Sequence, residues 1–221
     1  TRNKKLPHHV RTPEDMRFPP GAFVDYIRYR CATPLTVPGC THCTCGHALT
    51  DPEHPLLCSA NHGYTGTHRH NDTLHDLRRV ASNYGIATEV EPTFYQTDDL
   101  RRPDITFISH GDRSVVSDLT VVNPLCTTNR VHSEREPGGA AAHAADAKSV
   151  KHEPNARAVH HRFVPFAIET HGHQDPRIRQ GLSNVARDLE PYLRMAFARE
   201  AETALATAVA KTTNKALCTA S

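Results

Sequence analysis

The sequence predicts an α/β fold, with a small metal-binding module before the sheet and helices after it. Three observations support this prediction. Hydrophobic residues make up 38% and charged residues 23% of the 221 residues, which is enough for one core. Short apolar runs of strand length alternate with segments of helical periodicity. Four of the seven cysteines lie between Cys40 and Cys58, among histidines rather than apolar residues, which favours folding around a metal there.

The composition argues against several classes of protein. No stretch approaches the roughly 18 apolar residues of a membrane span, and no charged-then-apolar leader opens the chain, so we expect neither a membrane protein nor a freshly secreted one. An odd number of crowded cysteines favours a reducing compartment over a disulfide framework. The net charge of +2 does not by itself indicate a polyanionic partner, whereas 17 histidines point to metal chemistry. Because the chain begins with Thr1, we expect it to be a piece of a longer protein or a processed product.

Composition divides the chain into four parts. Residues 1–42 are rich in proline and scattered charge, and we interpret them as a leader or the remnant of a preceding domain. Residues 43–70 are rich in Cys, His, Gly and Pro and are predicted to fold around a metal. Residues 71–175 carry the predicted sheet, and residues 176–221 the C-terminal helices.

A helix and three strands are predicted at the start of the third part. The helix begins at Asn71 or Asp72, which would cap it, and ends before Gly85. The strands are predicted at residues 86–94, 104–109 and 114–122, with residues 110–113 as the hairpin turn between the second and third. Both faces of these last two strands are largely apolar, as in central strands that are covered on both sides.

A helix and a fourth strand complete the predicted sheet unit. The helix, rich in alanine, runs from Ala140 to His152, and Pro154 is predicted to stop it. The strand covers Phe163 to Glu169, and two more helices follow at about Arg177–Leu189 and Tyr192–Lys211. The order α-β-β-β-α-β predicts a mixed central sheet.

The spacing Cys-x-Cys-x8-His-x3-Cys predicts a structural zinc site. Cys43 and Cys45 form one close pair of ligands, and His54 and Cys58 form the other. Structural zinc sites are built from two such pairs separated by a loop, and all four positions are then filled by protein. Unrelated free or buried thiols are the alternative. Four further residues are close enough in sequence to replace one of these ligands: Cys40, His42, His47 and His62.

Two aspartates on neighbouring strands form a candidate site for Mg²⁺ or Mn²⁺. If the hairpin loop is centred on Gly111, Asp104 and Asp118 lie opposite each other, with Cβ atoms about 5 Å apart. Two carboxylates so close do not both stay ionised without a cation between them. Lys148 and Lys151, one turn apart on the next helix, would orient or deprotonate a water and offset phosphate charge. The alternatives are strand-end aspartates paired with arginines and a solvated basic helix face.

Together these motifs resemble the C-terminal region of certain non-LTR retrotransposon polyproteins, which carry a restriction-enzyme-like endonuclease of the PD-(D/E)XK superfamily after the reverse transcriptase. The resemblance covers about residues 43–175. It rests on the zinc motif, Arg69-His70-Asn71, Arg102-Pro103-Asp104, and Asp118 within Val116–Val122. It implies a restriction-endonuclease-like core with a mixed central sheet, a preceding zinc module and following helices.

The resemblance also implies roles for individual residues. Asp104 and Asp118 would bind the catalytic divalent ion, and Lys148 and Lys151 match the family's relocated Lys-x-x-Lys. Thr120 stands where the lysine of the superfamily is usually found. The chain departs from the family pattern in two places: residues 134–139 resemble an insertion, and His152 replaces an expected tyrosine.

The expected function is therefore a Mg²⁺-dependent DNA endonuclease that nicks target DNA and exposes a 3′-hydroxyl for target-primed reverse transcription. The expected partners are double-stranded DNA, the reverse transcriptase domain of the same polyprotein and the element RNA, in the nucleus. Arg69, Arg78 and Arg102 are candidate DNA contacts, because phosphate binding needs local rather than net positive charge. The main alternative is a catalytically inactive zinc-containing DNA-binding module from a degenerate copy.

Other interpretations of the sequence rest on weaker signals. One is a zinc hydrolase built on His160, His161, His171 and His173. Another is an assembly module with the contact stripe Leu189, Leu193, Phe197 and Leu205, although ordinary core packing also explains this stripe. Glu89 or Glu91 is a candidate outer metal ligand, and His171 is a candidate neighbour of the site. His70 and Asn71 are interpreted as a helix cap rather than as zinc ligands.

Overall fold

Four strands form a mixed sheet at the centre of the computed structural model. Their spatial order is β1-β2-β3-β4, with β1–β2 and β2–β3 antiparallel and β3–β4 parallel, so the predicted mixed α/β fold is confirmed. The strands are β1 (Ala87–Val90), β2 (Ile105–Ile108), β3 (Val115–Val122) and β4 (Arg162–Glu169). The structure describes residues 22–31, 41–43, 45–48, 50, 54–58, 60, 66–93, 102–109 and 113–219.

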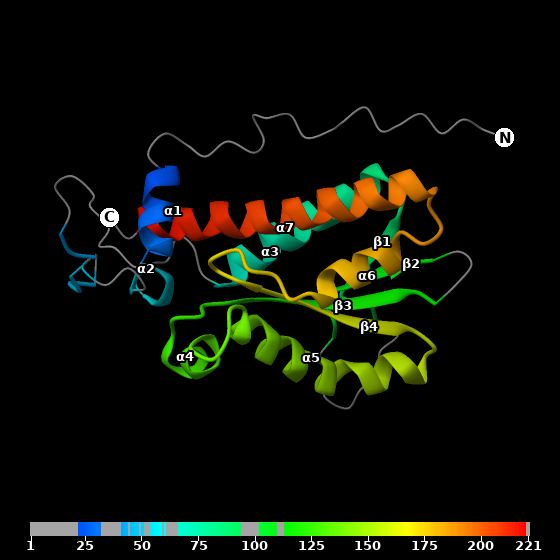
Figure 1. The fold of residues 1–221 in the computed structure, drawn as a ribbon, viewed down its shortest axis with the longest axis horizontal. Helices are drawn as coiled ribbons and strands as arrows, with labels where there is room; N and C mark the ends of the chain where they lie inside the picture. The colour runs from blue at the N-terminus through cyan, green and yellow to red at the C-terminus, as the bar shows by residue number, and fades with distance from the viewer. Residues whose placement is uncertain are drawn as a thin grey trace.

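Helices cover both faces of this sheet (Figure 1). The face that carries the main hydrophobic core is covered by α3 (Gly66–Asn83), α6 (Arg177–Val185) and α7 (Pro191–Thr219). The other face is covered by α4 (Thr127–Ser133) and α5 (Gly139–Ala158). Alanines bring α5 close to the sheet, because Ala141 and Ala145 pack on Ala167 of β4. None of the described helices is both long enough and apolar enough to span a bilayer.

Two short helices precede this unit, α1 (Ala22–Arg30) and α2 (His54–Leu57). Tyr26 and Tyr29 of α1 are buried in a cluster with Ala210 of α7. The Tyr29 hydroxyl also lies 2.6 Å from the hydroxyl of Thr170, just after β4. The described part of the segment interpreted as a leader is therefore packed against the core.

Helix α3 begins at Gly66, five residues before the predicted caps, so the predicted start was wrong. Polar side chains inside its first turns are accommodated by local contacts, as in the hydrogen bond from the Thr73 hydroxyl to the Arg69 carbonyl. The predicted end was right. Gly85 has a φ of +71°, and the amides of Gly85 and Ile86 bond back to Ser82 and Ala81, which is a Schellman cap.

Pro154 does not stop the helix after the sheet, as the sequence predicted, because α5 continues through it to Ala158. A proline inside a helix leaves the carbonyl four residues earlier without its amide partner. Here that carbonyl belongs to Val150, whose side chain is 80% exposed, and Pro154 itself is exposed. Both lie on the solvent side of α5, where water can satisfy the carbonyl.

The remaining elements differ from the prediction mainly in length. The strand at 86–94 shortens to β1, and α6 ends four residues before the predicted Leu189, whereas α7 begins with Pro191 and runs to Thr219. Helix α4 lies between the strand predicted at residues 114–122 and the helix predicted from Ala140, where the sequence predicted no regular element. Phe197 and Leu205 of the stripe considered for subunit contacts are fully buried inside this chain and Leu189 packs against the same core, so these three residues belong to core packing.

Candidate functional site

The four predicted zinc ligands come together in the structure. Ligand atoms of Cys43, Cys45, His54 and Cys58, here called the Cys/His cluster, all lie within 4.8 Å of one another. The Sγ atoms of Cys43 and Cys58 are 3.7 Å apart, and the Sγ of Cys45 is 3.1 Å from Nε2 of His54. Three thiols and one imidazole are the donor set that structural zinc sites use, so the Cys/His cluster can hold a metal such as zinc.

A tight turn presents the first two ligands. The Cys43 amide donates to the His47 carbonyl at 2.7 Å, and the Gly46 amide donates to the Cys43 carbonyl at 2.7 Å. Gly46 has a φ of +87°, a left-handed conformation that glycine adopts without strain. Helix α2 presents the other pair on one turn, with the Cys58 amide bonded to the His54 carbonyl at 2.9 Å.

The alternative ligands occupy other positions. The His47 ring stacks on the ring of His54, with centroids 4.1 Å apart, and His42 bonds to the neighbouring Thr41 hydroxyl. Cys40 and His62 lie outside the described residues. Among the described residues, the Cys/His cluster is the one group of three or more metal-ligating side chains close enough to share an ion. The histidine-based zinc hydrolase therefore has no cluster to support it.

The electrostatics of the Cys/His cluster also fit a cation. The backbone hydrogen bond at His47 acts to lower the pKa of the Cys45 thiol, but desolvation and the neighbouring thiols of Cys58 and Cys43 raise it overall. Crowded thiols disfavour one another's ionised forms because the negative charges repel. A divalent cation among them removes that repulsion and stabilises the thiolates.

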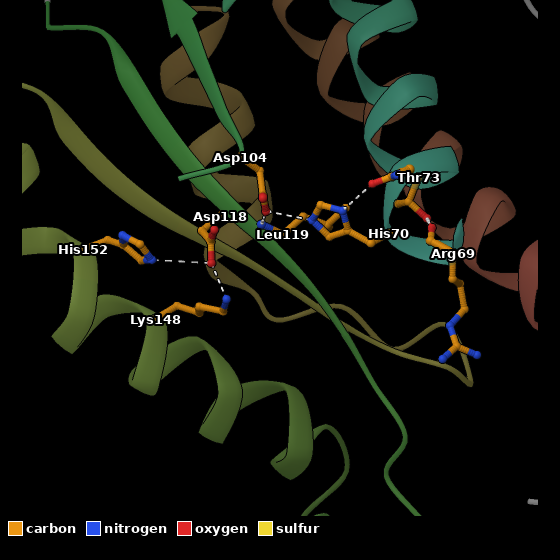
Figure 2. Close-up of polar contacts among 9 residues, drawn as sticks. Arg69, His70, Thr73, Asp104, Asp118, Leu119, Lys148 and His152 are labelled. Carbon is orange, nitrogen blue, oxygen red and sulfur yellow. Dashed lines mark hydrogen bonds and ion pairs between the residues drawn. The ribbon is translucent and has the colours of Figure 1, made fainter. Parts of the chain in front are cut away.

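A second site lies on the sheet, where Asp104 and Asp118 form what we call the acid pair (Figure 2). Ile105 of β2 pairs with Ser117 of β3, which puts Asp104 opposite Asp118. This register agrees with the predicted loop centred on Gly111, although residues 110–112 lie outside the described residues. Directly opposite residues of antiparallel strands have Cβ atoms about 5 Å apart, so the two carboxylates interact, and the Asp104 charge adds to burial in raising the pKa of Asp118.

Asp104 is held by two donors on the same oxygen. Its Oδ2 accepts the Leu119 amide at 2.6 Å and lies 2.8 Å from Nε2 of His70 on α3. Burial acts to raise the pKa of Asp104, but the His70 hydrogen bond and charge and the Leu119 amide outweigh it. The net pKa is lowered, so Asp104 is the more readily ionised member of the acid pair.

Asp118 has the opposite electrostatic balance. Only 4% exposed, it forms an ion pair from Oδ2 to the Lys148 ammonium of α5, and Nε2 of His152 is 3.6 Å from the same oxygen. Burial raises its pKa to about 6, the Asp104 charge adds to that, and Lys148 opposes it. Asp118 is therefore harder to ionise than a free carboxyl group, even with Lys148 in contact.

The two predicted lysines differ in what they touch. Lys148 reaches Asp118, whereas Lys151 makes no ion pair or side-chain hydrogen bond with any residue that the structure describes. His152, one helical turn after Lys148, is 4% exposed and stacks on Phe163. The buried side of α5 thus turns Lys148 and His152, rather than Lys151, toward Asp118.

Other sequence candidates lie elsewhere. Arg78 and Arg102 are exposed, whereas Arg69 is 8% exposed and its Nε and Nη1 atoms have no hydrogen-bond partner among the residues that the structure describes. That burial counts against a DNA contact by Arg69, which stays a prediction. His171 packs against the ring of Tyr29, not against the acid pair. Glu91 touches the site through its backbone, because its amide donates to the Asp104 carbonyl at 3.0 Å.

Sequence reasoning missed His70, which it interpreted as a cap, and gave His152 no role at the acid pair. Both residues lie on helices that cross the sheet, and their distance from the acids depends on how those helices pack. No spacing in the sequence encodes that packing.

No protein-family model matches the chain, and no curated protein matches it in sequence. The geometry of the two sites therefore carries the functional argument.

Proposed function

We propose that this chain is a divalent-metal-dependent DNA endonuclease with a restriction-endonuclease-like core. The observation that carries the proposal is the acid pair on antiparallel neighbours, with an ammonium supplied to Asp118 by Lys148 of α5. Carboxylate, carboxylate and lysine together are the groups that phosphodiester hydrolysis at a metal site requires. The element order α3-β1-β2-β3-α4-α5-β4, in which the short α4 precedes the helix that covers the sheet, supports the same fold.

The residues present fit a hard divalent ion. Asp104 and Asp118 would hold it, because oxygen donors suit Mg²⁺ and Mn²⁺ and because burial, and after it the nearby Asp104 charge, raises the pKa of Asp118, so that a bound cation would stabilise its ionised form. Such an ion, when bound, would supply Lewis-acid stabilisation of charge on the phosphate. Lys148 is 29% exposed on its side chain, so its ammonium can contact both Asp118 and an incoming phosphodiester.

In the proposed reaction, Lys148 orients the attacking water and offsets negative charge on the phosphate oxygens. The water oxygen forms a bond to phosphorus and gives up one proton to solvent, and the bond from phosphorus to the 3′ oxygen breaks. That oxygen takes up a proton and leaves as a 3′-hydroxyl, while the phosphate stays on the 5′ end. His152 and His70 hold the two aspartates in place during the reaction.

The wider context of the proposal comes from the motif resemblance. We infer that the exposed 3′-hydroxyl primes reverse transcription of the element RNA by a polymerase domain of the same retrotransposon polyprotein, in the nucleus. The Cys/His cluster, with zinc bound, would grip the duplex beside the cut, a positioning role that specifies no base sequence. These inferences rest on the zinc motif, Arg69-His70-Asn71 and Arg102-Pro103-Asp104.

Cleavage of supercoiled plasmid with Mg²⁺ or Mn²⁺ tests the proposal. We expect nicked circles from the wild type, none from Asp104→Ala, and a loss of about 100-fold or more from Lys148→Ala. Lys151→Ala is the matched control and should stay within a few-fold of wild type. A wild-type chain that is fully loaded with zinc and binds DNA without ever nicking it would support the inactive DNA-binding module instead.

A further inference from the structure

We propose that His70 is a positioning residue that fixes Asp104 so that a single oxygen, Oδ1, is offered to the metal ion. This inference rests on the proposed function, because it assigns a role toward the same ion. It concerns a residue that the sequence pattern places in a helix cap. Figure 2 shows the His70 ring pointing from α3 to the Asp104 carboxylate.

Counting donors on each carboxylate oxygen supports the proposal. Oδ2 of Asp104 contacts both the Leu119 amide, at 2.6 Å, and Nε2 of His70, at 2.8 Å. A carboxylate oxygen has two lone-pair sites in its plane, so these two donors fill Oδ2. Oδ1 is the oxygen left for a ligand role, and Asp104 would bind an ion through one oxygen only.

Asp118 shows the same division of its two oxygens. The Lys148 ammonium pairs with its Oδ2, and Nε2 of His152 lies 3.6 Å from that atom. Oδ2 of Asp104 is thus held by α3 and the Leu119 amide, and Oδ2 of Asp118 by α5. The two carboxylates also hydrogen-bond to each other across β2 and β3, so one ion between them can take the place of that contact.

The His70 ring is well placed to hold a carboxylate still. Its Nδ1 is 3.2 Å from Oδ1 of Asn71, which fixes the ring from its far side. Its helix is anchored in the main core by Leu77 and Val80, both fully buried. Partners of metal-binding carboxylates act by orienting the ligand, and losing one typically weakens metal binding about 10- to 100-fold.

A different role for His70 would have the opposite effect. If its ring served mainly as a positive counter-charge to Asp104, it would compete with the ion, and removing it would tighten metal binding. The positioning role predicts weaker binding. The direction of the change therefore separates the two roles.

Binding of Mn²⁺ to the full, zinc-loaded chain, followed by electron paramagnetic resonance, tests the inference without relying on activity. We expect His70→Asn to weaken Mn²⁺ binding about 10- to 100-fold and His70→Gln to stay within a few-fold of wild type. The asparagine and glutamine side chains differ by one methylene, and only the longer glutamine places an amide N–H where Nε2 of His70 lies. The Mn²⁺ concentration for half-maximal nicking should move in parallel.

Two controls separate the possible failures. His75→Ala removes an exposed histidine from the same helix and should leave binding unchanged, and Asp118→Asn should abolish it. Equal or tighter binding by His70→Asn overturns the positioning role, while the proposed function stands as long as wild type binds Mn²⁺ through Asp118. If wild type shows no Mn²⁺ binding that depends on Asp118, the proposed function and this inference both fail. Helical circular dichroism of each variant confirms that folding is intact.

Discussion

The Cys/His cluster and the acid pair differ in what holds their side chains together. The ligands of the Cys/His cluster all lie within residues 43–58, on one turn and one short helix. The groups around the acid pair come from α3, β2, β3 and α5, between His70 and His152. The first site is local in sequence, and the second is assembled by the tertiary fold.

The surroundings of the two sites differ in the same way. Cys45 is exposed and Cys58 half-buried, and the side chains described as buried near them are Cys43 and Pro55, with Leu56 half-buried. The acid pair adjoins fully buried side chains, including Ile105 and Val116. We therefore expect the Cys/His cluster to need its metal in order to fold, whereas packing preforms the acid pair.

Zinc removal should give the largest effect, because it should unfold the region of the Cys/His cluster and leave the acid pair folded. Structural zinc contributes about 10–16 kcal/mol to the folding of zinc-finger peptides. Chelation, or Cys58→Ser, should therefore abolish amide protection across residues 41–58 in hydrogen exchange, with loss of stoichiometric zinc. Protection in β2 and β3 should stay unchanged, because their core does not include the Cys/His cluster. Equal loss of protection in both regions would mean that they fold as one unit.

Asp118→Asn should give a smaller effect of opposite sign, a gain in stability without added divalent ions. The pKa of Asp118 is about 6 in the folded chain against 3.8 in the unfolded one, so the folded state holds the proton more tightly. Ionisation therefore costs folding free energy that is absent below pH 4, grows between pH 4 and 6, and is complete above pH 6. At about 1.4 kcal/mol per pKa unit, this cost is about 3 kcal/mol.

Thermal melts of wild type and Asp118→Asn from pH 4 to pH 8 measure this difference. We expect the variant to melt several degrees higher at pH 8 and to converge with wild type near pH 4. Glu153→Gln, at a 42% exposed carboxylate paired with Arg157, is the matched control and should show no such divergence. A variant that is less stable than wild type at pH 8 would mean that the Lys148 ion pair fully compensates Asp118.

The features that the sequence predicted correctly depend on local rules. Ligand spacing alone identified the four residues of the Cys/His cluster, because two close pairs and a loop suffice to form such a site. The register of Asp104 and Asp118 followed from the length of one hairpin loop. The left-handed Gly85 followed from the known preference for glycine after a helix.

The features that it missed depend on packing between distant segments. His70 contacts Asp104 because α3 begins at Gly66 and crosses near the start of β2, which no periodicity encodes. Lys148 rather than Lys151 reaches Asp118 because of how α5 is rotated against the sheet. A local rule predicts that Pro154 ends the helix, but α5 continues through Pro154 because this residue faces solvent.

The smallest expected effect is a change in the salt dependence of DNA binding, which shows which region of the chain contacts DNA. Arg78 is exposed and lines a surface hollow of about 550 Å³ together with His75, Arg79 and Ser82. If it contacts a backbone phosphate, Arg78→Ala should lower the slope of log affinity against log salt by about 0.9. Its stability should change by less than about 0.5 kcal/mol, as for most surface substitutions.

Duplex binding without divalent ions, measured by fluorescence anisotropy at several salt concentrations, checks this prediction. Arg102→Ala, also at an exposed arginine, should lower the slope by a similar amount, whereas Arg69→Ala should change thermal stability and leave the slope unaltered, because its guanidinium is buried. If neither exposed arginine alters the slope while Cys58→Ser does, DNA is held by the metal-dependent region. The packed core would then supply the acid pair, whereas the metal-dependent region would bind the DNA.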